Sequence, residues 1–207
     1  MKKRLQAMID WVEPGARLID IGSDHLIIPI QLIDRGITSL VFASDVNDGP
    51  LETMRRARGD RNITIIASDG LQQVSESIDS AIIAGMGGRL IQQIIEDSLD
   101  KFLALDYLIV QPMQQIEELR AYLQTHFEVV AERLIAEDRK IYHLLKLRPG
   151  SDDYDVIATK GLAPTEELAK YILTETKRWT RLLPMVGPQR RQQVLDRIAR
   201  LNQAKML

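Results

Sequence analysis

Hydrophobic residues follow two different periods along the first 150 residues of the chain. Short runs rich in β-branched residues predict buried strands at residues 17–21, 40–45, 63–68, 80–84 and 107–111. Between these runs, apolar positions recur at helical spacing and predict helices over about 26–35, 49–58, 88–99 and 115–125. This alternation is typical of βαβ units, so we expect a parallel sheet with helices on both faces.

The alternation ends near residue 127. Residues 127–134 and 140–147 both have the composition of strands. The connection over 135–139 is short, so we expect the two to pair as an antiparallel hairpin. With the five earlier strands, the sheet would have seven strands, most of them parallel.

A polar stretch at 149–155 interrupts the pattern and marks a predicted boundary. Beyond it, residues 164–182 and 188–205 predict two helices, and the proline and glycine between them would turn the chain back. We therefore predict an α/β domain at 1–150 and a small helical hairpin at 151–207.

The composition favours a globular protein without cysteine chemistry. Of 207 residues, 45% are hydrophobic and 27% are charged, and there is no cysteine. These values argue against a disordered chain and exclude disulfides, a thiol nucleophile and a cysteine-bound zinc. The basic start has no apolar stretch after it, and no apolar run is long enough to span a membrane. We expect a cytoplasmic protein with no membrane partner and no metal.

The net charge of −2 hides an asymmetry between the two parts of the chain. Residues 1–150 hold 17 Lys+Arg and 22 Asp+Glu, whereas residues 160–207 hold 10 and 4. An acidic body with a basic tail is therefore expected, instead of a uniformly neutral surface.

Polar residues and glycines follow each of the five predicted parallel strands, where ligands bind in open α/β sheets. The first loop has neither a G-x-G-x-x-G fingerprint nor a P-loop lysine, which disfavours a dinucleotide or a phosphate cradle. Asp45 is placed to accept from ribose hydroxyls and Asp69 from the amine of a base, while Gly22 and Gly85 allow close backbone approach. S-adenosylmethionine carries these groups. The alternative is that Asp and Gly are simply common in turns.

Several of these loops carry motifs that resemble one family, the bacterial tRNA adenine-22 N1-methyltransferases. The motifs are Asp-Ile-Gly-Ser-Asp-His at 20–25 with Pro29, Asp-Gly-Leu at 69–71, Ile-Ala-Gly-Met-Gly-Gly-Arg-Leu-Ile at 83–91 and Gln-Pro at 111–112. Residues 3–6 and 140–142 match as well. The resemblance covers most of residues 1–148 and weakens after 150, where the helical region looks shortened.

The resemblance implies a class I, Rossmann-like methyltransferase that transfers a methyl group from S-adenosylmethionine to N1 of an adenine in the D-arm region of tRNA. It implies Asp24 as the catalytic residue. The implied cofactor-binding residues are Asp20, Gly22, Ser23, Asp45, Asp69, Gly70, Gly85 and Met86. The expected substrate-binding residues are His25, Gln111, Pro112 and Met113 in this domain, and the basic composition of the tail adds Arg178, Arg181, Arg190 and Arg191.

The chemistry of this reaction asks little of a general base. Adenine N1 already has an in-plane lone pair, so catalysis would come chiefly from alignment with the methyl donor. A carboxylate such as Asp24 would stabilise the positive charge that develops on the base. The alternative, which carries less weight, is that Asp24 is a loop residue that caps the helix that follows it.

The tail supplies the cations that would hold tRNA phosphates. They are Lys177, Arg178, Arg181, Arg190, Arg191, Arg197, Arg200 and Lys205. The alternative is that these side chains form solvated helix faces.

Two departures from the family's usual sequence keep other functions open. Residues 25–29 read His-Leu-Ile-Ile-Pro where relatives usually have His-Ala-Tyr-Leu-Pro, and Met113 replaces an asparagine. The missing amide removes a group that could recognise a base edge. The alternatives are a tRNA-binding relative without activity and a methyltransferase for a small molecule. The sequence leaves the oligomeric state open, with a monomer slightly favoured.

Overall fold

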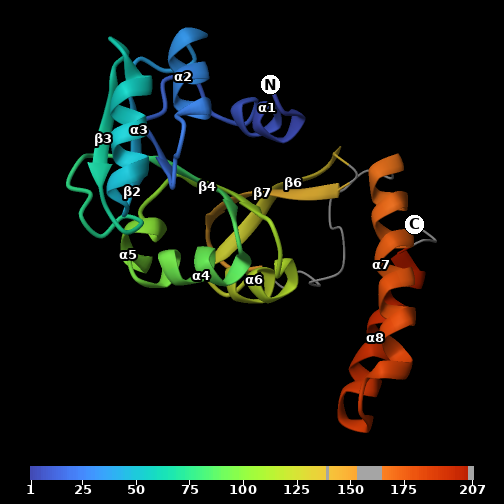
Figure 1. The fold of residues 1–207 in the computed structure, drawn as a ribbon. Helices are drawn as coiled ribbons and strands as arrows, with labels where there is room; N and C mark the ends of the chain where they lie inside the picture. Colours follow the sequence, from blue (N-terminus) through green and yellow to red (C-terminus); the bar gives the residue numbers. More distant parts are fainter. Residues whose placement is uncertain (139, 153–164, 205–207) are drawn as a thin grey trace.

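The computed structural model describes residues 1–138, 140–152 and 165–204, and its centre is one seven-stranded sheet (Figure 1). The strands are β1 (Leu18–Ile21), β2 (Val41–Asp45), β3 (Ile63–Ala67), β4 (Ser80–Met86), β5 (Tyr107–Pro112), β6 (Phe127–Glu137) and β7 (Lys140–Pro149). Their order in the sheet is β3-β2-β1-β4-β5-β7-β6. All neighbours pair in parallel up to β5, and β7 is antiparallel to both β5 and β6. The predicted fold class is confirmed.

Eight α-helices and one short 3-10 helix accompany the sheet in the described part of the chain. They are α1 (Lys3–Ile9), α2 (Ile27–Asp34), α3 (Asp48–Arg58), α4 (Gly88–Glu96), α5 (Leu99–Leu103), α6 (Ile116–Leu123), α7 (Glu166–Leu182), η1 (Leu183–Met185) and α8 (Pro188–Ala204). Helices α1, α2 and α3 pack on one face of the sheet, and α4, α5 and α6 pack on the other. The expected covering of both faces is therefore present.

Two predicted segments differ from the structure. The single helix expected over 88–99 is wrong, because α4 ends at Glu96 and Ser98 leaves helical geometry with a φ of −144° before α5 starts. The connection expected over 135–139 is too long, because Glu137 pairs with Lys140 across the hairpin. Asp138, with a φ of 49°, makes this tight turn, and Arg139 lies outside the described residues.

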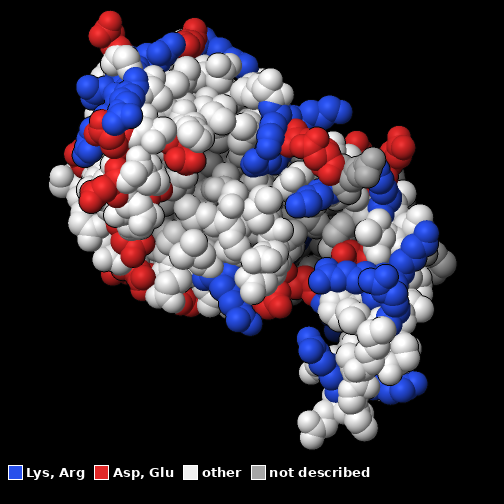
Figure 2. Space-filling view, viewed as in Figure 1, with Lys and Arg blue, Asp and Glu red and all other residues white. Residues whose placement is uncertain are grey.

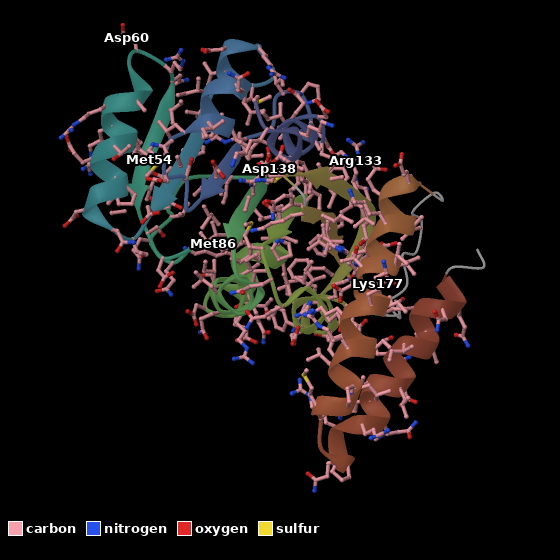
Figure 3. The ribbon with its side chains drawn as sticks, turned by 45° about the vertical axis from the view of Figure 1, so that its right-hand side comes forward. Met54, Asp60, Met86, Arg133, Asp138 and Lys177 are labelled. Atoms are coloured by element: carbon pink, nitrogen blue, oxygen red, sulfur yellow. The ribbon has the colours of Figure 1, made fainter. Side chains whose placement is uncertain are left out.

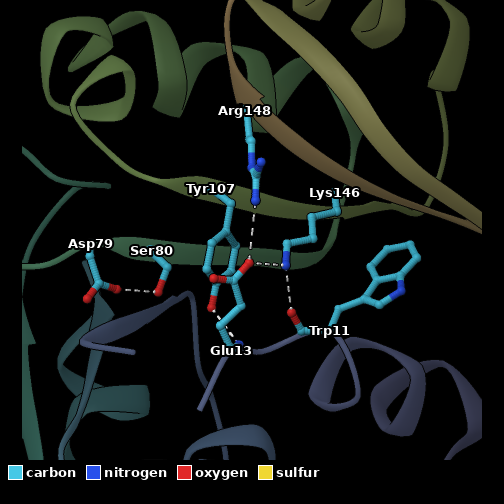
Figure 4. A network of polar contacts seen from close by, with 7 residues as sticks. All are labelled: Trp11, Glu13, Asp79, Ser80, Tyr107, Lys146 and Arg148. Atoms are coloured by element: carbon cyan, nitrogen blue, oxygen red, sulfur yellow. Dashed lines mark hydrogen bonds and ion pairs between the residues drawn. The ribbon is translucent and has the colours of Figure 1, made fainter. Parts of the chain in front are cut away.

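Helix α1 was not expected from the sequence. It is held by its buried inner side and by contacts just beyond its C-terminal end. Leu5, Met8 and Ile9 bury its inner side against the sheet. Beyond its end, the Lys146 ammonium donates to the Glu13 carboxylate at 2.8 Å and to the carbonyl of Trp11 at 3.0 Å (Figure 4). This network lies at the amino ends of the central strands, away from the edge where ligands bind.

The two tail helices lie side by side and pack against the hairpin through α7 (Figure 1). Leu168 and Ile172 of α7 and Leu201 of α8 form a small apolar cluster with Leu134 of β6. The Thr165 hydroxyl caps α7 by accepting from the amide of Leu168 at 3.1 Å. The predicted start of this helix at residue 164 lies outside the described residues. In the described residues, no helix has both the length and the apolar character needed to cross a membrane.

Candidate active site

The topological switch point of the sheet lies between β1 and β4, and a glycine follows β1 there. Gly22 has a φ of +73°, and its amide donates to the carbonyl of Ser44 at 2.7 Å. A Cβ atom on Gly22 would lie 2.0 Å from the Cε of Met86, so the thioether of Met86 occupies the space that glycine leaves. Met86 itself lies at the carboxyl end of β4 (Figure 3). These two predicted cofactor residues are in contact.

Asp20 and Ser23 lie beneath this turn. Asp20 is only 6% exposed, and burial raises the pKa of its carboxyl to about 7, while a hydrogen bond from Ser23 opposes the shift. The carboxyl of Asp20 therefore changes charge near neutral pH. A cationic ligand group nearby would favour its ionised form.

Gly85 is exposed at the other side of the switch point. The pairing of β4 with β5 shifts register between Ala84 and Met86, and Gly85 takes a φ of +80° at this bulge. Apart from Gly85 and its two chain neighbours, no described residue has an atom within 4 Å of the position that its Cβ would take. The backbone of Gly85 therefore faces open space into which a ligand could fit.

Three further predicted cofactor residues follow β2 and β3. Asp45 is half-buried, and its Oδ1 accepts from the amide and side chain of Asn47 at 2.8 and 3.1 Å. Asp69 is exposed. Gly70 is buried, and a Cβ there would lie 2.7 Å from the side chain of Ile94. Gly70 thus allows α4 to pack closely, which is a structural use of the residue.

Asp24 and His25 are exposed to solvent just before α2. Their side chains are 60% and 65% exposed, and Asp24 Oδ2 lies 3.1 Å from His25 Nε2. Leu26, which is buried and has a φ of 53°, turns the chain into the helix after them. A carboxylate and an imidazole are therefore presented together beside the switch point.

The segment Gln111-Pro112-Met113 ends β5. The Gln111 side chain is fully buried, and its Oε1 accepts from Arg4 at 2.8 Å, so it does not face solvent. Met113 is 41% exposed, and its amide donates to the carbonyl of Met86 at 2.8 Å. The segment is thus joined to the end of β4, with Met113 as its outward side chain.

A cleft of about 580 Å³ opens at Met113 and separates the sheet domain from the tail. Its walls come from the start of α6, from the tip of the hairpin and from the tail helices. Arg178 and Arg190 line it, whereas Arg181 and Arg191 are exposed outside it. Lys and Arg are frequent on the tail surface shown in Figure 2. The structure therefore brings two of the four predicted tail arginines to the same cleft as Met113.

Comparison with known proteins adds to this geometry. A methyltransferase domain family matches residues 1–145. The tRNA (adenine(22)-N(1))-methyltransferase of Bacillus subtilis is 32% identical over 193 residues, which are 88% of this chain and 81% of that protein. The chain belongs to this methyltransferase family. The family prediction is confirmed.

Solved structures of methyltransferases resemble the chain over its whole length. The crystal structure of Streptococcus pneumoniae Sp1610 in complex with S-adenosyl-L-methionine has a TM-score of 0.86 at 29% identity, covering 99% of both chains. The crystal structure of the B. subtilis m1A22 tRNA methyltransferase TrmK has a TM-score of 0.85 at 25% identity, covering 99% and 98%. The likeness includes the tail, so the helical hairpin is not a feature of this chain alone.

The residues at the switch point of this methyltransferase fit the predicted cofactor. The backbone of Gly85 faces open space, the buried carboxyl of Asp20 suits a cationic group, and Asp45 presents a carboxylate at the end of β2. In the described residues, no group of three or more His, Asp or Glu side chains could hold a metal ion.

Several residues that surround Gln111 in this methyltransferase had no role assigned from the sequence. Arg4 contacts Gln111, and Glu137 pairs with Arg4 from the hairpin tip. Tyr142 is buried, and its ring lies beneath the Arg4 guanidinium at 5.3 Å from its centroid. Residues 3–6 and 140–142 match the family's sequence, but the match alone assigns them no role. For Arg4, the matching segment was the available signal.

Arg197 also differs from the expected exposed cation. Its side chain is 19% exposed, pairs with Glu117 of α6 and lies 4.0 Å over the ring of Trp179. Burial lowers the pKa of Arg197 to about 10, so it remains charged at neutral pH. The ion pair between Arg197 and Glu117 connects the tail to the methyltransferase domain.

Proposed function

We propose that this protein is a tRNA methyltransferase that transfers the methyl group of S-adenosylmethionine to N1 of the adenine at position 22. One observation carries the proposal. The exposed Asp24 follows β1 at the same sheet edge as the glycines and acids suited to the cofactor, and Met113, which follows β5 at this edge, lines a cleft together with two tail arginines. The B. subtilis relative bears the name of this activity.

The cofactor would be held by residues of β1, β2 and β4. Met86 fills the open side of Gly22, so the backbone that a ligand can approach closely is that of Gly85, and Oδ2 of the Asp45 carboxylate suits ribose hydroxyls. When bound, S-adenosylmethionine supplies an electrophilic methyl group on a cationic sulfur. The ionised carboxyl of Asp20 would complement the positive charge of this ligand.

Asp24 would act on the base. Its carboxylate accepts hydrogen bonds, so it orients an exocyclic amine and stabilises the positive charge that N1 gains on methylation. Its Oδ2 lies 3.1 Å from Nε2 of His25. Because N1 needs no proton removed, alignment of the base supplies most of the rate enhancement.

The tail would bind the tRNA backbone. Arg178 and Arg190 line the cleft and are exposed, so they can form forked hydrogen bonds with phosphates. Removal of one phosphate-binding cation lowers the salt dependence of binding by about one unit of slope. Arg190→Gln should therefore weaken tRNA binding and flatten its salt dependence more than Arg191→Gln, which is the matched control on the same helix.

The decisive experiment measures methyl transfer to unmodified tRNA. Purified protein, labelled S-adenosylmethionine and a tRNA with adenine at position 22 are incubated, and the modified base is mapped. An otherwise identical tRNA with guanine at position 22 is the control. We expect transfer only to the first tRNA, and Asp24→Asn should slow it by about 100-fold while leaving cofactor affinity within about twofold. Cofactor binding without transfer to the adenine would refute the proposal.

A further inference from the structure

Arg4 links the N-terminal helix to the end of β5. Its Nη1 donates to Gln111 Oε1 at 2.8 Å, across 107 positions of sequence. The side chains of both residues are withdrawn from solvent, since Arg4 is 15% exposed and Gln111 is fully buried. A hydrogen bond from a charged donor in such surroundings is stronger than an exposed one.

The position of Arg4 is itself fixed by its neighbours. Its Nε lies 3.4 Å from Oε2 of Glu137, which is 9% exposed, and its guanidinium lies over the ring of Tyr142. The backbone amide of Lys3 also donates to Glu137. Helix α1 is anchored beyond its other end by Glu13 and Lys146, so Arg4 has little freedom to move.

The chemistry of arginine decides which way the Gln111 amide points. A guanidinium has only donors, so Oε1 of Gln111 must face Arg4 and Nε2 must face away. Nε2 then donates to the carbonyl of Pro112 at 2.9 Å and lies 3.5 Å from the sulfur of Met113. Without Arg4, a buried acceptor would lose its partner and the amide could rotate.

The segment that Gln111 holds is the one beside the cofactor site. The amide of Met113 donates to the carbonyl of Met86, whose side chain touches Gly22 at the switch point. Met113 also stands at the mouth of the cleft. A change in the orientation of Gln111 would therefore be transmitted to the place where the base has to align with the methyl donor.

We infer that Arg4 is a positioning residue for methyl transfer, which acts through the Gln111 amide on the Gln111-Pro112-Met113 segment. This inference rests on the proposed function. Arg4 does not need to touch tRNA or cofactor in this role. Its removal should therefore lower kcat and leave KM for tRNA and the affinity for S-adenosylmethionine nearly unchanged.

The test compares Arg4→Met with Arg35→Met. Arg35 makes the same kind of hydrogen bond, to Gln31 Oε1 at 2.8 Å, but on the exposed surface of α2. The assay uses saturating tRNA and cofactor at a temperature below the unfolding temperature of each variant. Under these conditions Arg4→Met should lower kcat by about tenfold, which is the effect of removing one charge-assisted hydrogen bond. Arg35→Met should stay within twofold of the wild type. Arg4→Lys keeps a charged donor and should recover part of the activity.

A double-mutant cycle separates positioning from general destabilisation. Gln111→Met should lower kcat about as much as Arg4→Met, and the double variant should be no slower than either one, because both substitutions remove the same hydrogen bond. Single effects that multiply, or an Arg4→Met enzyme within twofold of Arg35→Met, would overturn the inference. So would Arg4→Lys without any recovery. Absence of transfer by the wild type would instead refute the proposed function, and this inference with it.

Discussion

The close packing of Gly22 and Met86 can be tested by adding one methyl group. In Gly22→Ala, the new Cβ would lie 2.0 Å from Met86 Cε, so the thioether has to leave its position. The backbone φ of +73° costs an L-residue about 1–2 kcal/mol in addition. Displacing a packed side chain costs about 1–3 kcal/mol more. We expect Gly22→Ala to destabilise the protein by about 2–5 kcal/mol.

Two matched variants separate these contributions. Gly36 has a φ of +66°, and among the described residues no atom lies within 4 Å of its potential Cβ, so Gly36→Ala measures the backbone cost alone. In a Met86→Ala background the clash disappears, and Gly22→Ala should then cost only about 1–2 kcal/mol. Each kcal/mol corresponds to about 2–4 °C in Tm for a chain of this size.

Thermal unfolding with and without S-adenosylmethionine measures both stability and binding. Gly22→Ala should also weaken cofactor affinity, because the displaced Met86 side chain enters the space beside the switch point. A Gly22→Ala variant no less stable than Gly36→Ala would refute the steric argument. The same holds if the Met86→Ala background gives no relief.

Three further predictions concern the site and its supports. Burial raises the pKa of Asp20 to about 7, so between about pH 4 and 7 the folded state binds one more proton than the unfolded state, and the protein without ligand should become less stable as the pH rises. Cofactor affinity, measured by calorimetry, should rise from pH 6 to 8. In Asp20→Asn, the affinity should no longer depend on pH in this range. Met113→Asn should raise kcat/KM for tRNA by about two- to tenfold, the effect of one added hydrogen bond, and an unchanged rate would show that Met113 already suits the base. Glu132→Gln removes the carboxylate that pairs with the buried Arg120 and should cost about 3–5 kcal/mol in denaturant unfolding.

The strands could be predicted because their sequence signals are local. Every strand of the sheet begins within about two residues of its expected start, since β-branched runs stand between turn residues. Helix α1 is not evident from the sequence, because it has only seven residues and its helical signal rests on the spacing of Leu5, Met8 and Ile9 beside a run of basic residues. Ser98, a residue that favours helix starts, was the available signal for the break between α4 and α5.

The sheet edge at which the candidate site is proposed follows from the predicted topology, because topology brings strand ends together. Parallel strands place their carboxyl ends at one edge, so the loops after β1 and β4 meet whatever their exact sequence. The partners of individual side chains could not be predicted in this way. Arg4 and Gln111 are 107 positions apart, and their hydrogen bond depends on how α1 crosses the sheet. For Gly70, the loop pattern indicated a cofactor-binding residue, whereas the structure shows that Gly70 packs closely against Ile94.

The basic residues of the tail have two different physical roles, and a count of charges does not distinguish them. The basic tail suits an anionic partner, but Arg197 directs its charge to Glu117 of α6 and packs over Trp179. An arginine fixed in this way orders the tail against the acidic body, and the order places Arg178 and Arg190 along one cleft. The Arg197–Glu117 pair and the apolar cluster of Leu134 with the tail helices together hold the tail in place. A tail that was only a flexible basic arm would attract RNA equally well, but it would not set the distance between phosphates and the methyl donor.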